Sequence, residues 1–315
     1  MKNNILIVPD VHGHTKWKKA VQGNSFDHII FLGDYLDPYF EDMLVCHITN
    51  GSSLDNFNDI INFKKANPEK VTLLLGNHDC NYIYGEQVGG NCREDFFHYK
   101  EIQSLFRSNK LLFQFAWDIT LRKKHYVFSH AGISTLWMDK FFDNWTPDNM
   151  VEILNAENIK ALESTEPQNT PFGKAIAIAG KYRGTNENYG SPIWIDAELL
   201  NESEQIDGVI QIVGHTRCIS LYPIFTPHVI YTDCCGEVFK MNDYGTFRTM
   251  ADKVCKNLHQ NPFDPYENTD RKRTIELDDF YRPYCRKCGS RDIFVRAGTM
   301  VDSYVCKNCG AQEFM

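Results

Sequence analysis

VTLLLGNHDC, residues 71–80, joins a continuous apolar run to a cluster of polar residues. Four aliphatic residues and a threonine fill the first five positions, a composition typical of a buried β-strand. The run ends at Gly76, and Asn77, His78 and Asp79 follow it directly. Taken alone, these residues are also ordinary turn chemistry, because Asn and Asp tolerate left-handed backbone. A functional interpretation therefore depends on whether the arrangement recurs along the chain.

Four further apolar runs of five residues end in the same way. They are NILIV (4–8), HIIFL (28–32), HYVFS (125–129) and VIQIV (209–213). Continuous runs rich in β-branched residues are typical of strands that are covered on both faces. The residues of metal-ligand type that follow the five runs are Asp10 and His12, Asp34 and Asp37, Asn77 and His78, His130, and His215.

The segments between the first three runs have helical periodicity. TKWKKAVQG (15–23) and SLDNFNDIINFKKAN (53–67) place apolar residues three and four positions apart, and Ser53 is the expected cap of the second. Alternating strands and helices predict βαβ units and a largely parallel sheet. Ligands of such sheets bind beyond the carboxyl ends of the strands. We therefore expect an α/β fold in which the five polar clusters meet at one site.

Three later segments complete the coarse reading of the chain. LLFQFAWDITL (111–121) has the composition of one strand, and TPDNMVEILNAENIKALE (146–163) begins with helix-start signals. KYRGTNENYGSP (181–192) is rich in Gly and Asn and is expected to be a long loop, a candidate lid.

Composition places the chain among ordinary soluble globular proteins. Its 315 residues are 43% hydrophobic and 23% charged, with a net charge of −8. Residues 271–315 hold nine Lys and Arg against six Asp and Glu, a net +3 that leaves −11 for the remainder. This balance argues against broad nucleic-acid binding by the whole chain. The sequence shows neither a signal peptide nor a membrane-spanning run, and its eleven cysteines fit a reducing, cytoplasmic setting.

The C-terminal end carries a separate metal-binding pattern. Cys285 and Cys288 form one CxxC pair, and Cys306 and Cys309 form a second one after 17 intervening residues. This spacing predicts a four-cysteine zinc ribbon with one structural zinc ion. Such a module is too small to hold a core without its ion, and it could contact nucleic acid or protein.

The sequence predicts three regions. Residues 1–250 hold the five apolar runs and the further strands expected between residues 227 and 250. Residues 283–315 hold the ribbon. Residues 251–282 shift to Pro, Asp and charged side chains, which is typical of a linker.

The residue types after the five runs indicate the metal. Carboxylate, imidazole and amide ligands without thiolate suit Mn, Fe or Zn in a hydrolytic site. These candidate ligands are more than one ion needs if coordination positions must stay open for water and substrate. Two ions that share one carboxylate fit better, because such pairs, ~3.5–4 Å apart, activate water and hold the oxygens of a phosphoryl group.

In their order, these motifs resemble those of the calcineurin-like metallophosphoesterase superfamily. The matching motifs are Asp10-x-His12, Gly33-Asp34-x-x-Asp37, Gly76-Asn77-His78-Asp79, His130 and Gly214-His215, and the resemblance spans roughly residues 5–240. It implies an α/β/β/α sandwich with a dinuclear centre. The implied ligands are Asp10 and His12 for the first ion, Asp34 as the bridge, and Asn77, His130 and His215 for the second ion.

The resemblance also implies roles for residues that hold no metal. His78 would stabilise the transition state and protonate the leaving oxygen, and Asp37 would orient its imidazole and favour the charged form. Asp79 is interpreted as a cap of the helix that follows it.

The sequence departs from the family pattern at two places. The last motif is GHTR, with Arg217 where many members carry a second His, which resembles the protein phosphatase-like branch, and SHAGIS (129–134) agrees with that branch. Pro38 stands where protein Ser/Thr phosphatases place an Arg. We expect Arg183 to bind the phosphate, with Arg217 or Arg93 as substitutes; a solvated loop charge is the alternative for Arg183.

Three functions are compatible with these motifs. The first is a phosphatase that acts on phosphomonoesters or phosphoanhydrides, with phosphoproteins or nucleoside polyphosphates as substrates. The second acts on nucleic-acid ends or diesters that the ribbon would hold. The third is a scaffold without catalysis, which is disfavoured because such scaffolds usually lack the ligands present here.

Overall fold

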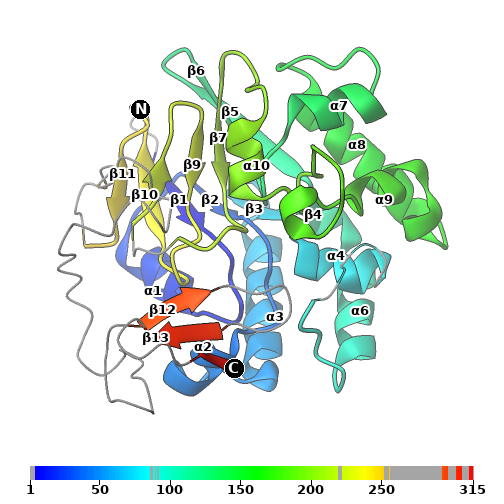
Figure 1. Ribbon diagram of the computed structural model, residues 1–315. Coiled ribbons are helices and arrows are strands. Elements are labelled where there is room, and N and C mark those ends of the chain that lie inside the picture. The colour runs from blue at the N-terminus through cyan, green and yellow to red at the C-terminus, as the bar shows by residue number, and fades with distance from the viewer. Residues whose placement is uncertain are drawn as a thin grey trace. The chain divides into compact units, whose positions relative to one another are not determined.

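The computed structural model describes residues 4–85, 88, 90, 92–218, 222–251 and 255, together with the backbone of three short strands between residues 293 and 314. The chain divides into two compact units, Met1–Phe263 and Asp264–Met315. The first unit contains two sheets with helices around them (Figure 1). The fold is therefore of the predicted α/β class, with the predicted layered sandwich.

The first sheet has six strands in the order β11-β10-β1-β2-β3-β4. Strands β1 to β4 run parallel, and β10 and β11 pair antiparallel beside β1. The predicted runs 4–8, 28–32 and 71–75 form three of these strands. The bounds are β1 Asn4–Val8, β2 His28–Phe31, β3 Val71–Leu74, β4 Phe113–Gln114, β10 Phe239–Asn242 and β11 Phe247–Thr249.

The second sheet has five strands in the order β5-β6-β7-β9-β8. Strands β6, β7 and β9 are parallel, whereas β5 and β8 are antiparallel edge strands. The runs 125–129 and 209–213 supply β6 and β7. The bounds are β5 Ala116–Leu121, β6 Lys124–Ser129, β7 Val209–Val213, β8 Ile224–Phe225 and β9 Val229–Tyr231.

The two faces of the first sheet enter different cores, which explains the continuous apolar runs. Ile5 and Ile7 of β1 face the second sheet, where they join a core with Phe128 of β6. Leu6 and Val8 of the same strand face a second core that the helices cover. Alternate residues of one strand are thus buried on opposite sides, as expected for strands covered on both faces.

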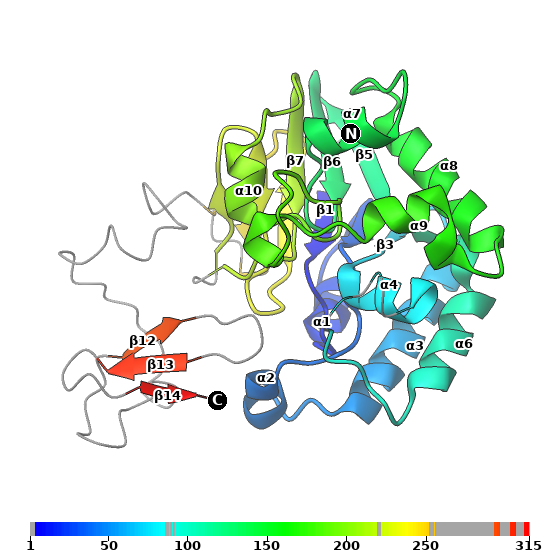
Figure 2. The ribbon, with the colours of Figure 1, turned by 45° about the vertical axis from the view of Figure 1, so that its right-hand side comes forward.

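Helices cover the outer face of the first sheet. Figure 2 shows α3 beside α6, and the rings of Phe57 and Phe106 lie 4.6 Å apart at their contact. Further helices pack around the second sheet (Figure 1). The bounds are α1 Lys16–Gly23, α2 Phe40–Val45, α3 Asn50–Ala66, α4 Asn77–Tyr84, α6 Tyr99–Ser108, α7 Thr135–Phe141, α8 Met150–Glu163, α9 Pro171–Ile176 and α10 Ala197–Glu202.

Two sequence expectations were wrong in detail. Helix α3 begins one turn before the predicted cap Ser53, because Thr49 caps it by accepting from the N–H of Ser52. The single strand expected over residues 111–121 is divided between β4 in the first sheet and β5 in the second. The segment 181–192 begins with a short 3-10 turn, Lys181–Arg183, and is otherwise largely loop, as expected.

The second unit contains a three-stranded antiparallel sheet of its own. Its strands are β12 (Ile293–Arg296), β13 (Ser303–Cys306) and β14 (Gln312–Phe314), in that order. Cys306 ends β13, whereas Cys285, Cys288 and Cys309 lie outside the described residues. The zinc ribbon and the boundaries of the predicted linker therefore stay predictions.

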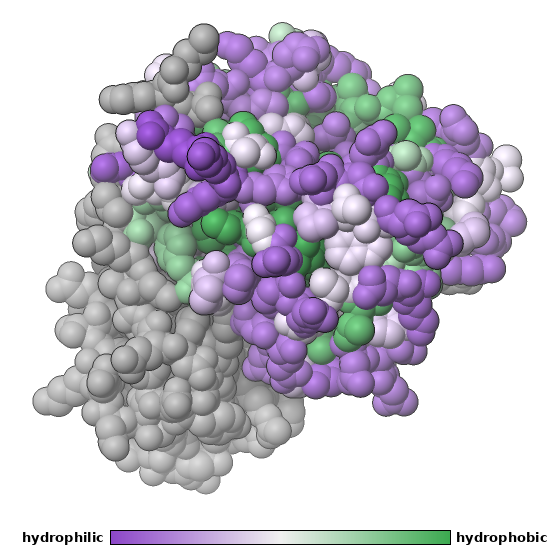
Figure 3. Space-filling view, turned by 90° about the horizontal axis from the view of Figure 1, so that it is seen from above, coloured by the Kyte–Doolittle hydropathy of each residue, from purple (hydrophilic) through white to green (hydrophobic). Residues whose placement is uncertain are grey.

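The surface of the first unit agrees with its composition. Seen from above, the described side chains are mainly hydrophilic, with smaller hydrophobic areas between them (Figure 3). Among the described residues, no helix combines the length and apolar character needed to cross a membrane.

Candidate metal centre

Ligand-type side chains from both sheets meet where the parallel strands end. Asp10 and His12 follow β1, Asp34 follows β2, His130 follows β6 and His215 follows β7. Asn77 and His78 form the first turn of α4, directly after β3. All of these side chains are buried, with exposed fractions of 7% or less. The five clusters therefore meet at one site, between the ends of strands from both sheets.

The turns that carry these side chains use unusual backbone. His12, Asp34, Asp37 and His215 all have positive φ, between 39° and 63°. Left-handed backbone is uncommon for residues other than Gly and costs free energy unless the surroundings hold it. Its concentration at the predicted site is typical of functional loops whose geometry matters more than their local stability.

Two glycines let these loops approach one another. A Cβ atom on Gly76 would collide with the Asp34 carboxylate, and one on Gly214 would collide with the Asp10 carboxylate. This close approach explains why the apolar run at residues 71–75 stops at a glycine. No other residue fits at either position without moving a predicted ligand.

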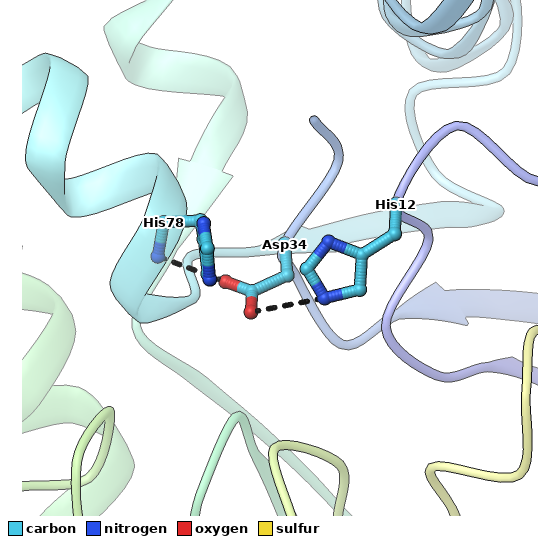
Figure 4. Close-up of side chains that lie close together, drawn as sticks. All are labelled: His12, Asp34 and His78. Carbon is cyan, nitrogen blue, oxygen red and sulfur yellow. Dashed lines mark hydrogen bonds and ion pairs between the residues drawn. The ribbon is translucent and has the colours of Figure 1, made fainter. Parts of the chain in front are cut away.

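Asp34 lies between two groups of candidate ligands, one that contains His12 and one that contains His130. Its Oδ2 atom is 3.6 Å from Nε2 of His12 and 3.6 Å from Nε2 of His130. Its Oδ1 atom accepts the backbone N–H of His78 at 3.0 Å. Figure 4 shows the imidazole of His12 directed at the Asp34 carboxylate, with His78 on the other side. A carboxylate in this position can contact ions on both sides.

The second group consists of Asn77, His130 and His215. Asn77 Oδ1 lies 3.0 Å from His130 Nε2 and 3.1 Å from His215 Nδ1, and these two nitrogens are 3.2 Å apart. At metal–ligand distances of about 2.0–2.2 Å, neighbouring ligand atoms lie about 3 Å apart. The three atoms therefore have the mutual spacing of ligands around one ion.

Backbone carbonyls orient two of the histidines. His12 Nδ1 donates to the carbonyl of Leu36 at 2.8 Å, and His130 Nδ1 donates to the carbonyl of Leu32 at 2.9 Å. These bonds leave Nε2 as the atom that faces the centre, which is the usual way of fixing a metal-binding imidazole. Within the described part of the chain, the buried Nε2 of His12 has no hydrogen-bond partner. An unpartnered buried nitrogen that faces carboxylates fits a metal ligand.

The charges of the centre also fit divalent cations. Burial, followed by repulsion from Asp233, raises the pKa of Asp10; burial, followed by repulsion from Asp79, raises the pKa of Asp34. Burial is likewise the largest cause that lowers the pKa of His12 and of His215. Crowded carboxylates beside neutral imidazoles are the groups that a bound cation stabilises.

His78 and Asp37 form the expected pair. Nδ1 of His78 lies 2.8 Å from Oδ2 of Asp37, whose other oxygen accepts from the hydroxyl of Tyr82. Burial raises the pKa of Asp37 to about 7. Burial, and then the charge of Arg93, lowers the pKa of His78. Asp37 thus engages the imidazole, but it is not among the causes that shift the pKa of His78, which moves away from the expected charged form.

Asp79 does more than the predicted helix cap. Its carboxylate accepts the N–H of Gly76 at 2.8 Å, which caps α4, and also those of Asp34 at 2.7 Å and Tyr35 at 3.1 Å. Burial raises its pKa to about 6. Asp79 therefore fixes the loop that holds Asp34 against the loop that holds Asn77.

Three arginines lie near this centre. Arg93 and Arg217 both pack on the ring of Tyr39, with Cζ atoms 3.8 Å and 4.6 Å from its centroid. Arg93 also donates to the carbonyl of Asp37 at 3.1 Å. Arg183, the first candidate from the sequence, forms a 3.2 Å ion pair with Asp196. Its charge is nevertheless the second cause, after burial, of the lowered pKa of His215.

Sequence reasoning missed Tyr39 and Asp233. Tyr39 packs edge-on against His12, with ring centroids 4.8 Å apart, and supports the two arginines. Its position directly after Asp37 and Pro38 was the available signal. Asp233 follows β9 and faces Asp10, a closeness that no motif in the sequence reveals.

Comparison with known protein families gives one match that covers most of the first unit. The family described as calcineurin-like phosphoesterase matches residues 4–218. Similar solved structures include a cold-active protein-tyrosine phosphatase of a psychrophilic Shewanella species, with 15% identity, coverage of 79% of this chain and 80% of that chain, and a TM-score of 0.41. A protein serine/threonine phosphatase from Saccharomyces cerevisiae shows 13% identity, coverage of 76% and 72%, and a TM-score of 0.44. No curated protein matches the chain.

Proposed function

The chain belongs to the calcineurin-like phosphoesterase family, and we propose that it is a dinuclear phosphatase for phosphomonoesters or phosphoanhydrides. As a member of this family it is a phosphoric ester hydrolase that uses divalent metal ions. The position of Asp34 Oδ2, 3.6 Å from a histidine of each ligand group, carries the proposal of two ions. Asp10 and His12 would hold the first ion with Asp34. Asn77, His130 and His215 would hold the second with Asp34.

Two divalent ions in this place would supply an activated water and balance the charge on the phosphoryl oxygens. Oxygen and nitrogen ligands suit Mn, Fe or Zn. The family match and the ligand geometry support the site, and metal analysis of the purified protein would identify the ions.

His78 is the proposed general acid. Its Nδ1 is engaged by Asp37 at 2.8 Å, which leaves Nε2 to give a proton to the leaving oxygen. Tyr82 holds the other oxygen of Asp37, so the imidazole is oriented through two successive hydrogen bonds. Binding of the anionic substrate beside it would favour the protonated imidazole, against the burial that lowers the pKa of His78.

Arginines at the rim are the proposed phosphate-binding groups. Arg93 and Arg217 are held by the two contacts with Tyr39, which itself packs on His12. Arg93 donates to a backbone carbonyl and makes no ion pair with the described residues. Its remaining N–H groups can therefore bind phosphoryl oxygens, and it takes the part that Pro38 cannot. Arg183 is the third candidate, because Asp196 already holds it.

A substrate screen tests the proposal. The manganese-loaded protein would be assayed with phosphopeptides, dinucleoside polyphosphates and oligonucleotides phosphorylated at the 5′ or 3′ end, with Asp34→Asn as the control. Release of phosphate from one of the first two classes, lost in the control, supports the proposal. Activity confined to oligonucleotides would favour the nucleic-acid alternative, and no activity in any class would favour a scaffold.

A cytoplasmic setting stays a proposal that rests on cysteine usage.

A further inference from the structure

Asp233 is a buried carboxylate that the proposed mechanism does not use. It lies two residues beyond β9, which pairs parallel with β7, so it emerges at the sheet edge that also carries His215. Its carbonyl accepts the N–H of Cys218 at 2.7 Å, and Thr232 bonds to the carbonyl of Val213 at 2.8 Å. The backbone therefore fixes Asp233, and only 3% of the residue is exposed.

The side chain of Asp233 is only partly satisfied. The backbone N–H of Cys235 favours its charged form, whereas its Oδ2 atom is buried without a hydrogen-bond partner in the described structure. A buried carboxylate oxygen without a donor costs free energy, which makes a missing ligand or water the natural explanation. Its charged or titratable neighbours include Arg217, Asp42 and His14, and it also repels Asp10.

Asp233 faces the first-ion side of the centre. It lines one small cavity together with Asp10 and His12, the two ligands proposed for the first ion alone. Repulsion from Asp233 is the largest contribution of any neighbouring group to the raised pKa of Asp10, larger than that from Asp34. The same cavity contains Arg217, at the sequence position where Gly-His-x-His members of the family carry another histidine.

We propose that Asp233 is a positioning residue for the first metal ion and holds a water molecule of that ion's coordination shell. The inference rests on the proposed dinuclear site. The contact is placed through water because Asp233 belongs to neither of the two clusters whose ligand atoms lie within 4.8 Å of one another, His12–Asp34–His78 and Asp10–Asp34–His130. Its unpartnered oxygen accepts a hydrogen bond from the water, and its charge offsets the cation. Asp233 thus supports the first ion, on the side where Arg217 stands in place of the second histidine of Gly-His-x-His members.

The test measures metal affinity in Asp233→Asn. The substitution keeps the size of the side chain and one oxygen, and it removes the charge and one of the two acceptor oxygens. Metal-free wild type and variant would be titrated with Mn²⁺ and followed by calorimetry. We expect one of the two ions to bind about 10–100-fold more weakly in the variant, the usual effect of losing a group that supports a ligand from outside the first shell.

Thermal unfolding gives a second readout that a purely structural role would not produce. Without metal, Asp233→Asn should melt no lower than wild type, because its repulsion with Asp10 is gone. With Mn²⁺, the increase in Tm should be smaller in the variant than in wild type. Asp118 lies on β5, where it pairs with His125 of β6, and Asp118→Asn should behave as wild type in both measurements.

The outcomes separate this inference from the proposed function. If wild type binds two ions and Asp233→Asn binds both with unchanged affinity, Asp233 has no part in metal binding and the inference is overturned. If wild type binds fewer than two ions, the dinuclear site itself is wrong. Asp233→Ser, which also keeps an oxygen for Cys235, replaces the first variant if that one fails to fold.

Discussion

His78 is the single residue whose chemistry can be separated from metal binding. It is buried beside Asp34 and engaged by Asp37 through Nδ1. We expect His78→Asn to bind both ions but to lose roughly 10²–10⁴ in kcat, the usual contribution of a positioned general acid. The loss should be smaller for p-nitrophenyl phosphate, whose leaving group needs no proton, than for an alkyl phosphate. Equal losses for both substrates would argue against the role of acid.

The arginines around Tyr39 should differ from Arg183 in their effect on substrate. Arg93 lies nearest to the His78–Asp37 pair, through its bond to the carbonyl of Asp37. We expect Arg93→Ala to lower kcat/KM about 10–100-fold, consistent with about 1.5–3 kcal/mol for a charge-assisted hydrogen bond. Inhibition by inorganic phosphate should weaken in parallel. A loss confined to Arg183→Ala would instead assign the phosphate to the loop that the sequence favoured.

The interface of the two sheets contains a histidine whose protonation should affect stability. His28 of β2 stacks on Trp117 of β5 at 4.6 Å, and its Nε2 lies 2.8 Å from Thr72 Oγ1. Burial, followed by the charge of Lys64, lowers its pKa to about 4. The unfolded chain therefore takes up the proton first as the pH falls from about 6.5 towards 4, and the fold loses stability in that window.

Replacing this ring by Phe keeps the stacking and removes the proton. Between pH 7 and pH 5, His28→Phe should lose about 1 kcal/mol less unfolding free energy than wild type, after allowance for the partial exposure of His28. Urea unfolding at the two pH values measures the difference, and other titrating groups cancel between the two proteins. An identical pH dependence would show that His28 is already protonated in the folded state, or that its protonation does not change the unfolding free energy.

Elements that depend on local signals could be predicted from the sequence, whereas those set by distant contacts could not. The five apolar runs became β1, β2, β3, β6 and β7 because burial on both faces requires continuous apolar residues. The division of residues 111–121 between β4 and β5 has no local signal, since Phe115 is apolar and buried like Phe113 and Ala116 on either side of the division. The earlier start of α3 reflects the reciprocal bonds of Thr49 and Ser52, which a search for a single cap residue overlooks.

The sequence allowed the ligand residues of the candidate site to be predicted together. It did not reveal the residues that surround them. Ligands such as Asp34 and His130 could be predicted because each directly follows the carboxyl end of a strand, where ligands of α/β sheets bind. The contacts of Tyr39 with Arg93 and Arg217 join segments more than 50 residues apart, so no spacing in the sequence encodes them. Asp233 was missed for the same reason.

The predicted zinc ribbon should be separable from hydrolysis at the scale of the whole chain. All proposed ligands of the dinuclear centre lie before residue 216, and a closed four-cysteine site offers no position for water or substrate. A chain ended at Tyr281 should keep its turnover of a small aryl phosphate within a few-fold. Activity on a larger substrate should fall if the ribbon binds nucleic acid or protein.

The variant Cys306→Ser with Cys309→Ser is the matched control for this truncation, because it leaves residues 251–282 in place. Its turnover of the small substrate should equal that of wild type. If this variant stays folded, keeps two ions in the catalytic unit and still cannot hydrolyse the small substrate, the ribbon belongs to the active site.

Whether one carboxylate joins two ions can be tested by anomalous diffraction from crystals of the manganese-loaded protein. Asp34 Oδ2 lies 3.6 Å from both His12 Nε2 and His130 Nε2, so we expect one ion on each side of this carboxylate. Two anomalous peaks ~3.5–4 Å apart should appear, one beside Asp10 and His12 and the other beside Asn77, His130 and His215. A single peak at full occupancy, or two peaks that do not share Asp34, would show that Asp34 does not bridge two ions.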